Sequence, residues 1–173
     1  MKSNDYGKAQ IKLRGTKQQL TECIKDMLVP MDWCDNELGY EVKEHDNYIE
    51  FNLQQKCIQA SKNTKSYDGF FRRWVIKDLC VSYFYFNSFY FKETDKENEF
   101  MVTLDCFLEY GQDFIEDLEY FSKKYGLLVR FFVCYDKYDI LRSLEIRHGS
   151  VVLDEKKTIA QVRWEYPFLA LYR

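Results

Sequence analysis

The stretch C-V-S-Y-F-Y-F-N-S-F-Y-F, residues 80–91, decides the predicted fold. Seven of the nine residues from Tyr83 to Phe91 are aromatic, and neither Gly nor Pro interrupts the run. Continuous aromatic and β-branched residues are typical of a strand that is covered on both faces. We therefore expect Cys80–Phe91 to be a central strand that holds two layers together.

Other strands are predicted on both sides of this stretch. After the charged turn Glu93–Glu99, the segment Phe100–Leu108 alternates between apolar and polar residues, so we expect it to pair back as a hairpin. Upstream, Ala9–Gly15 alternates as a half-buried strand does. A second strand is expected from Tyr48 to about residue 58, with a short one at Tyr40–Val42.

Two helices are predicted between these strands. Thr16 with Gln19 three residues later is a capping-box pattern, and the helix should run to about Leu28 and be stopped by Pro30. Asp113–Tyr125 carries acidic residues in its first turns and lysines in its last, which matches the helix macrodipole. A glycine follows it directly, as expected at a helix C-terminus.

The remaining chain is predicted to be strands. These are 127–135, then 141–148 and 151–154 around a Gly149-Ser150 turn, and finally 158–165. The element order predicts an α+β, ferredoxin-like sandwich, in which a mainly antiparallel sheet has two helices on one face and extra β-hairpins. At 173 residues, we expect a single domain spanning 1–173 with an aromatic-rich insertion around 61–99.

Net charge, cysteine spacing and the length of apolar runs indicate which classes of protein the chain could belong to. The net charge is −3, which argues against wholesale binding to nucleic acid or anionic membrane, but basic and acidic residues occur in blocks that could form a two-signed surface. Six cysteines without a C-x-x-C pair, and a polar N-terminus without a signal-peptide pattern, favour free thiols and a cytoplasmic location. No apolar run is long enough to cross a membrane.

The sequence motifs give little support for enzyme activity. Phosphate-loop, dinucleotide-binding and serine-elbow patterns are all missing. His45 lies among Glu41, Glu44 and Asp46, a carboxylate–histidine group that could ligate a divalent metal, but its spacing fits no helical metal frame. His148 is expected to be a solvated turn residue. We expect no enzyme activity, no cofactor and no metal site.

The segment F-F-R-R-W, residues 70–74, is the best candidate contact site. Arg and Trp anchor many protein interfaces, and burying three aromatics together with two arginines after an Asp-Gly turn is awkward. The alternative is that these aromatics cover one end of the core while the arginines reach solvent. The predicted partner-binding residues combine this segment with the acidic 32–46 loop: Phe71, Arg72, Arg73, Trp74, Asp32, Asp35, Glu37, Glu41 and Glu44.

Several short motifs resemble those of the YubB-type ferredoxin-like domain family of phage, plasmid and other mobile-element proteins. They are G-K-A-Q-I-K-L-R-G-T at residues 7–16, Y-I-E-F at 48–51, S-K-K-Y at 122–125 and R-W-E-Y-P-F at 163–168. The 61–99 segment is richer in aromatics than the family pattern. The resemblance implies the fold and a mobile-element setting, and it carries over no activity and no catalytic residue.

We therefore expect a non-enzymatic binding or inhibitor protein of a mobile genetic element. Its concrete form is a phage anti-defence protein of the anti-CRISPR type that occludes a host protein or ribonucleoprotein, such as a CRISPR nuclease. The alternative is a module that binds RNA or single-stranded nucleic acid through sheet aromatics and Arg72/Arg73. The acidic flanks of residues 80–91 and the missing RNA-recognition signature argue against this alternative.

Overall fold

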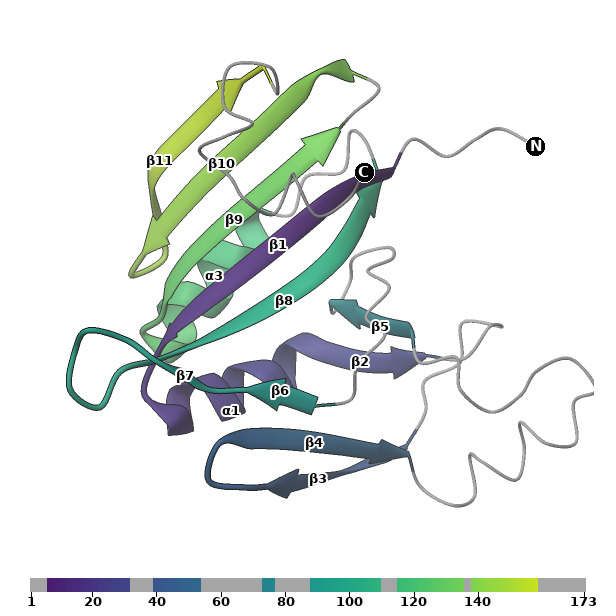
Figure 1. Ribbon diagram of the computed structural model, residues 1–173, viewed down its shortest axis with the longest axis vertical. Coiled ribbons are helices and arrows are strands. Elements are labelled where there is room, and N and C mark those ends of the chain that lie inside the picture. Colours follow the sequence, from purple (N-terminus) through teal and green to yellow (C-terminus); the bar gives the residue numbers. More distant parts are fainter. Residues whose placement is uncertain are drawn as a thin grey trace, which may run out of the picture.

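The protein is described from a computed structural model, which describes residues 6–31, 39–53, 73–76, 88–109, 115–135 and 138–158 of the 173-residue chain. Its largest element is a six-stranded sheet in the order β11-β10-β9-β1-β8-β7, in which every neighbouring pair is antiparallel (Figure 1). Its strands are β1 (Tyr6–Gly15), β7 (Lys92–Glu93), β8 (Phe100–Glu109), β9 (Leu128–Tyr135), β10 (Ile140–Arg147) and β11 (Ser150–Lys157).

Strand β1 lies inside this sheet because it pairs with β8 along its whole length and with β9 along most of it. The predicted alternation is confirmed, since Ala9, Ile11 and Leu13 are all buried. Leu13 lies opposite Val102 on β8 and Val129 on β9, and both of these are also buried. The intervening residues of β1 therefore face away from the core.

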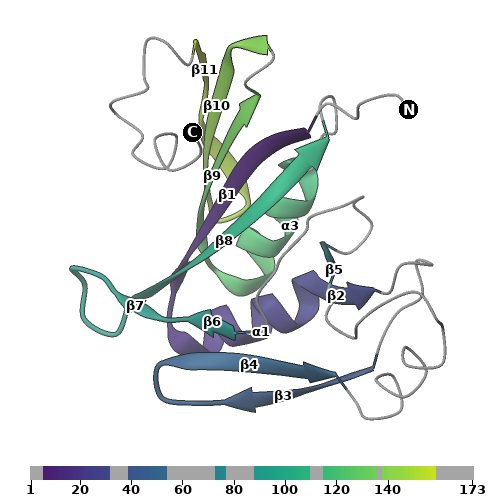
Figure 2. The same cartoon turned by 45° about the vertical axis from the view of Figure 1, so that its right-hand side comes forward.

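The described part of the chain forms two helices, α1 (Lys17–Met27) and α3 (Ile115–Tyr125), and both lie on the same side of the six-stranded sheet (Figures 1 and 2). The capping box predicted at the start of α1 is confirmed. The Gln19 backbone N–H donates to Thr16 Oγ1 over 3.2 Å, and the Thr16 N–H donates to Gln19 Oε1 over 2.9 Å. In the described part of the chain, no helix is long and apolar enough to cross a membrane.

A second, three-stranded sheet covers the other side of α1. It consists of β3 (Tyr40–Glu44), β4 (Tyr48–Leu53) and β6 (Ser88–Tyr90), in the order β3-β4-β6 (Figure 1). Ile49, Phe51 and Phe89 of this sheet join the same apolar core as the six-stranded sheet. Helix α1 therefore lies between two sheets, a layer that the sequence did not predict.

The central role predicted for Cys80–Phe91 is not confirmed. The described end of this stretch, Ser88–Tyr90, pairs only with β4 among the described strands, and only Lys92–Glu93 pairs with β8. Phe89 is 5% exposed but Tyr90 is 61% exposed, so β6 is covered on one face only. The predicted hairpin with Phe100–Leu108 is thus limited to two residue pairs, since β8 pairs mainly with β1. Residues 80–87 lie outside the described residues.

A short strand was missed after α1. The helix ends at Met27, and Leu28–Met31 forms β2, which pairs with β5 (Arg73–Ile76). Pro30 therefore lies in a strand, opposite Trp74, and does not simply follow a helix as a stop. Proline is tolerated there because β2 has no second strand neighbour in the described part of the chain.

The remaining boundaries agree with the prediction to within a few residues, with one exception. Gly126 has a φ of 65°, as a helix-ending glycine does, and the turn before β11 is centred on His148 and Gly149, with φ of 50° and 78°. Strand β11 continues to Lys157, and Thr158 is not part of a strand, so the predicted break after residue 154 is wrong. The predicted strand residues 54–58 and 159–165 lie outside the described residues. Within the described residues, the fold is α+β, with two helices and mostly antiparallel sheets.

Candidate binding surface

The structure places only part of the predicted contact site. Glu41 and Glu44 lie on β3, are exposed, and the Glu44 carboxylate accepts from Lys25 Nζ over 2.6 Å. Arg73 and Trp74 lie on β5, where the structure describes the backbone and its pairing with β2. Asp32, Asp35, Glu37, Phe71 and Arg72 lie outside the described residues. Strands β3 and β5 belong to different small sheets. That the acidic residues of β3 and the Arg73–Trp74 pair of β5 form one contact surface therefore stays a prediction.

His45, in the acidic turn between β3 and β4, contacts side chains of β4. The His45 ring stacks on Tyr48 with a centroid separation of 4.1 Å, and His45 Nε2 lies 3.7 Å from Glu50 Oε2. Among the residues that the structure describes, no three His, Cys, Asp or Glu side chains are grouped so that they could hold a metal ion. His148 is exposed in its turn, as predicted.

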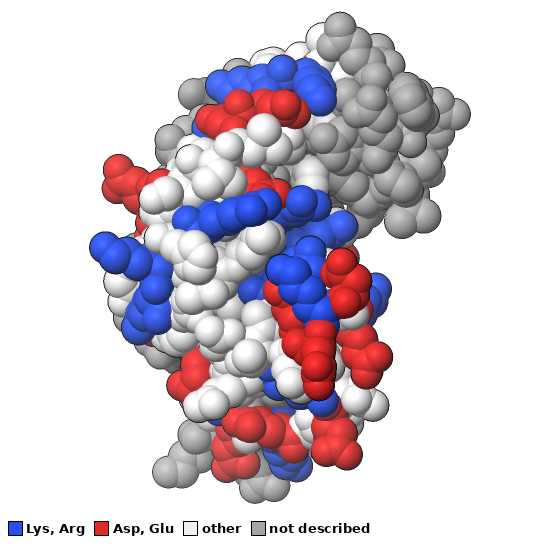
Figure 3. All heavy atoms as spheres, turned by 90° about the vertical axis from the view of Figure 1, so that its left-hand side faces the viewer, with Lys and Arg blue, Asp and Glu red and all other residues white. Residues whose placement is uncertain are grey.

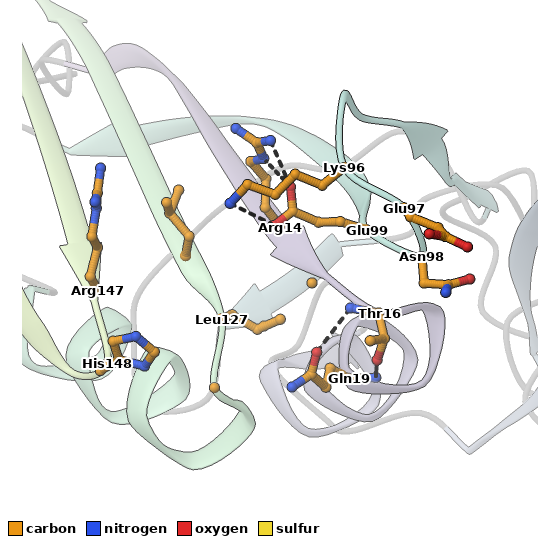
Figure 4. A pocket seen from close by; sticks show the side chains of 13 residues that line it. Arg14, Thr16, Gln19, Lys96, Glu97, Asn98, Glu99, Leu127, Arg147 and His148 are labelled. Atoms are coloured by element: carbon orange, nitrogen blue, oxygen red, sulfur yellow. Dashed lines mark hydrogen bonds and ion pairs between the residues drawn. The ribbon is translucent and has the colours of Figure 1, made fainter.

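A pocket of about 430 Å³ lies where β1 enters α1, between the β7–β8 loop and the β10–β11 turn (Figure 4). On one wall, the Arg14 guanidinium donates to Glu99 Oε1 over 2.6 Å and to Asp95 Oδ1 over 3.0 Å. Burial alone would raise the pKa of Glu99, but hydrogen bonds from Thr94 and Arg14, with the Arg14 charge, hold it below its ordinary value. The strongest charges of this wall thus neutralise one another.

Residues on the other walls of this pocket also make hydrogen bonds within the protein. Thr16 and Gln19 form the α1 capping box, and Figure 4 shows Arg147 and His148 on the opposite side from Arg14 and Glu99. Arg147 Nε donates to Glu145 Oε1 over 2.6 Å. The groups around the pocket therefore stabilise the end of the sheet, and we assign it no ligand.

An exposed apolar segment begins strand β11. Val151, Val152 and Leu153 are 36%, 55% and 40% exposed, and we call these three residues the β11 apolar edge. β11 is the last strand of the sheet among the described residues, so its outer side has no strand partner there. Figure 3, which views the molecule from the β11 side, shows an uncharged area bordered by groups of Lys/Arg and Asp/Glu.

Helix α3 contacts the beginning of strand β11 through Glu119. The Val151 backbone N–H donates to Glu119 Oε1 over 3.3 Å, which places the beginning of β11 beside α3. On the next residue of the helix, the Tyr120 side chain is 55% exposed, with Lys124 Nζ 5.3 Å from its ring centroid. Lys124 Nζ also binds Asp26 Oδ2 of α1 over 2.6 Å, so Tyr120 lies on the side of α3 that faces α1 and not beside Val151.

A β-bulge limits how far this edge can pair. Opposite β10, Glu145 faces Leu153 and Ile146 faces Val151, so Val152 is the extra residue. Bulges and charged residues are the devices by which edge strands avoid unlimited association. The second half of β11, Asp154 to Lys157, is charged throughout. The exposed apolar part of β11 is therefore short, and the charged second half of the strand disfavours edge-to-edge pairing.

Sequence reasoning predicted the strand but missed this surface. The available signal was that Val151-Val152-Leu153 does not alternate, although the strand lies at the end of the predicted sheet order. Three consecutive apolar residues in a strand that is solvated on one side must expose at least one of them.

No protein-family model, curated protein or solved structure matches the chain.

Proposed function

We propose that the protein is a non-enzymatic binding protein of a mobile genetic element, which acts by occluding a host protein or ribonucleoprotein. The observation that carries the proposal is the β11 apolar edge at the end of the six-stranded sheet. An extended segment of a partner can add to such an edge through main-chain hydrogen bonds, and exposed side chains beside it then provide specificity.

The mobile-element setting, and the anti-CRISPR type of anti-defence activity, rest on the resemblance to the YubB-type family. The finer fold assignment, a ferredoxin-like sandwich, belongs to the same proposal. It is supported by the succession β1, α1, β7, β8, α3, β9 and by the strand order β9-β1-β8-β7, although β7 has only two residues. The contacts predicted at Phe71, Arg72, Arg73 and Trp74 remain part of the proposal.

The test uses a panel of purified CRISPR nuclease–guide complexes. We expect the wild-type protein to co-elute with at least one of them in size-exclusion chromatography and to inhibit its cleavage of target DNA. The Val152→Lys variant, which places a charge in the β11 apolar edge, should lose both effects. The Tyr90→Lys variant is the matched control, because it places the same charge on an exposed side chain of the other sheet.

Two outcomes would contradict the proposal. One is that no complex in the panel is bound or inhibited by the wild-type protein. The other is that Val152→Lys inhibits as strongly as Tyr90→Lys, which would remove the β11 apolar edge from the interface.

A second candidate function, binding to single-stranded nucleic acid, needs a different surface from the one predicted. The sequence predicted that bases would stack on the aromatic residues of segment 80–91. In the described part of this segment, residues 88–91, Phe89 is buried and Phe91 packs partly against the core, so neither ring is open to a base. Tyr90 stays exposed, but it lies on the small sheet. The observation that favours this function is a group of cations on the six-stranded sheet.

A further inference from the structure

The face of the six-stranded sheet that is turned away from the helices gathers cationic side chains from different strands. On β1, Lys8, Lys12 and Arg14 alternate with the buried residues and so lie on this face. Lys12 lies directly opposite Arg130 on β9, and directly opposed residues of neighbouring strands point to the same side. Lys92 on β7 lies opposite Met101, which in turn lies opposite Arg14. We call Lys12, Lys92 and Arg130 the cationic face.

The cations of this face affect one another. The pKa of Lys12 is lowered from its ordinary value, first by burial and then by the nearby charges of Arg130 and Lys92, and Asp105 compensates only in part. Like charges held together in this way destabilise the folded protein unless an anion lies between them. Lys12 and Lys92 make no ion pair within the described residues.

The carboxylates of the face are fewer than its cations and are shared. Glu145 lies between two arginines, since Arg130 Nε donates to its Oε2 over 2.7 Å and Arg147 Nε to its Oε1 over 2.6 Å. Asp105 accepts a hydrogen bond from Gln10 Nε2 over 2.7 Å. Arg14 is bound by two carboxylates, Glu99 and Asp95, and is left out of the cationic face, whereas Arg130 shares the single Glu145 carboxylate with Arg147 and keeps part of its charge uncompensated. Among the described residues, Lys12 and Lys92 are therefore the cations of this face that are available to an external anion.

The size of the face fits more than one phosphate. β7 and β9 are three strand positions apart, which corresponds to roughly 14 Å at the usual interstrand spacing of about 4.8 Å. Phe132, half-buried on β9 with its ring centroid 5.7 Å from Lys12 Nζ, adds an aromatic surface among the cations. A positively charged groove with an aromatic platform is the arrangement that single-stranded nucleic acid prefers.

We propose that the cationic face, Lys12, Lys92 and Arg130, binds the phosphate backbone of single-stranded nucleic acid, with Phe132 beside the bound strand. The proposal does not depend on the β11 apolar edge or on any defence complex. It also differs from the nucleic-acid hypothesis drawn from the sequence, which used Arg72, Arg73 and the aromatics of residues 80–91.

The experiment is fluorescence anisotropy of the full chain with fluorescein-labelled dT12 and U12 at 50 and 200 mM NaCl. We expect binding that weakens with salt, with a slope of about −2 in log–log form, because about three phosphates would be neutralised at about −0.7 each. Lys12→Glu and Lys92→Glu should each weaken binding at least tenfold at 50 mM NaCl. Glu145→Gln should tighten binding severalfold, because it releases Arg130 and Arg147 from their shared carboxylate.

The matched control is Lys123→Glu, which makes the same change of net charge at an exposed position on helix α3. It should bind both strands as the wild type does. Circular dichroism and thermal melting verify that each variant is folded, and exposed Lys92 provides the second variant if Lys12→Glu does not fold.

The proposal is overturned if neither strand changes its anisotropy at 50 mM NaCl, or if Lys123→Glu weakens binding as much as Lys12→Glu and Lys92→Glu. Preferential binding to a 12-base-pair duplex, or to vesicles rich in phosphatidylserine with no binding to dT12 or U12, would also overturn it.

Discussion

At the scale of single residues, Ser122 is a buried polar side chain that joins three segments of the chain. Its hydroxyl donates to the Leu127 carbonyl over 2.7 Å and accepts from the Gly149 N–H over 3.1 Å. These bonds connect the end of α3, the start of β9 and the turn before β11. The position of the β11 apolar edge therefore depends on one hydroxyl group in the core.

Replacement of Ser122 by Ala should lower the free energy of unfolding by about 1–3 kcal/mol, because it leaves a buried donor and a buried acceptor without their partner. Urea denaturation followed by circular dichroism measures the effect. Ser150→Ala, an exposed position in the same turn, is the control and should change stability by less than about 0.5 kcal/mol. Equal stability of the two variants would contradict the role assigned to Ser122.

Gly126 and Gly149 provide a second test at this scale, since both have positive φ but differ in the space around them. A Cβ at Gly126 would meet only the end of the flexible Gln19 side chain at 3.2 Å, so Gly126→Ala should cost about 1 kcal/mol. A Cβ at Gly149 would lie 2.6 Å from the Cβ of Lys123, so Gly149→Ala should be clearly more destabilising. Thermal melts of the two variants should show this order, and the reverse order would be inconsistent with the packing of the turn on α3.

At the scale of elements, the β7–β8 loop is attached to β1 by charge. Arg14 near the end of β1 binds Glu99 and Asp95, and Thr94 Oγ1 donates to Glu99 Oε1 over 2.9 Å. The two residues of β7 could not hold this loop by strand pairing alone. The ionised Glu99 carboxylate is therefore what orders the loop beside Lys92 and the cationic face.

This attachment predicts a pH dependence. Because the pKa of Glu99 is lower in the folded protein, its contribution to stability is complete above the ordinary carboxyl pKa of about 4.5 and is lost as the pH falls through the folded value. Glu99→Gln should therefore be less stable than the wild type at pH 7, and the difference should shrink as the pH falls below the ordinary carboxyl value. Urea denaturation at pH 7, 5 and 3 measures it, and a difference that stays constant with pH would contradict the ionic role.

At the scale of the whole molecule, helix α1 packs between two sheets, and Cys23 and Cys106 lie in this common core. Burial, and then the charge of Asp26, raises the pKa of Cys23 to about 12, and burial followed by the charge of Asp105 does the same for Cys106. A thiol with such a pKa is almost entirely protonated at pH 8 and is a poor nucleophile. Both residues act as small apolar side chains of the core.

We therefore expect Cys23 and Cys106 to resist iodoacetamide at pH 8 in the folded protein and to react in 8 M urea, with peptide mapping by mass spectrometry to identify each site. Rapid labelling of either thiol in the folded protein would show that the layer around α1 opens readily.

The sequence by itself determined the local features that short-range physics controls. The alternation of Ala9, Ile11 and Leu13 specified the buried face of β1, the Thr16–Gln19 pair specified the start of α1, and Gly126 specified the end of α3. Such signals depend on residues only a few positions apart. The α+β class followed from their order.

Only the tertiary structure decided which strands are neighbours and which side chains share a surface. The hydrophobic period shows which face of a strand is buried but not which strand lies beside it, so Ser88–Tyr90 joined the small sheet although its composition predicted a central strand. For the same reason, Lys12, Lys92 and Arg130, which lie far apart in the chain, became one cationic face only when β1 paired with both β8 and β9.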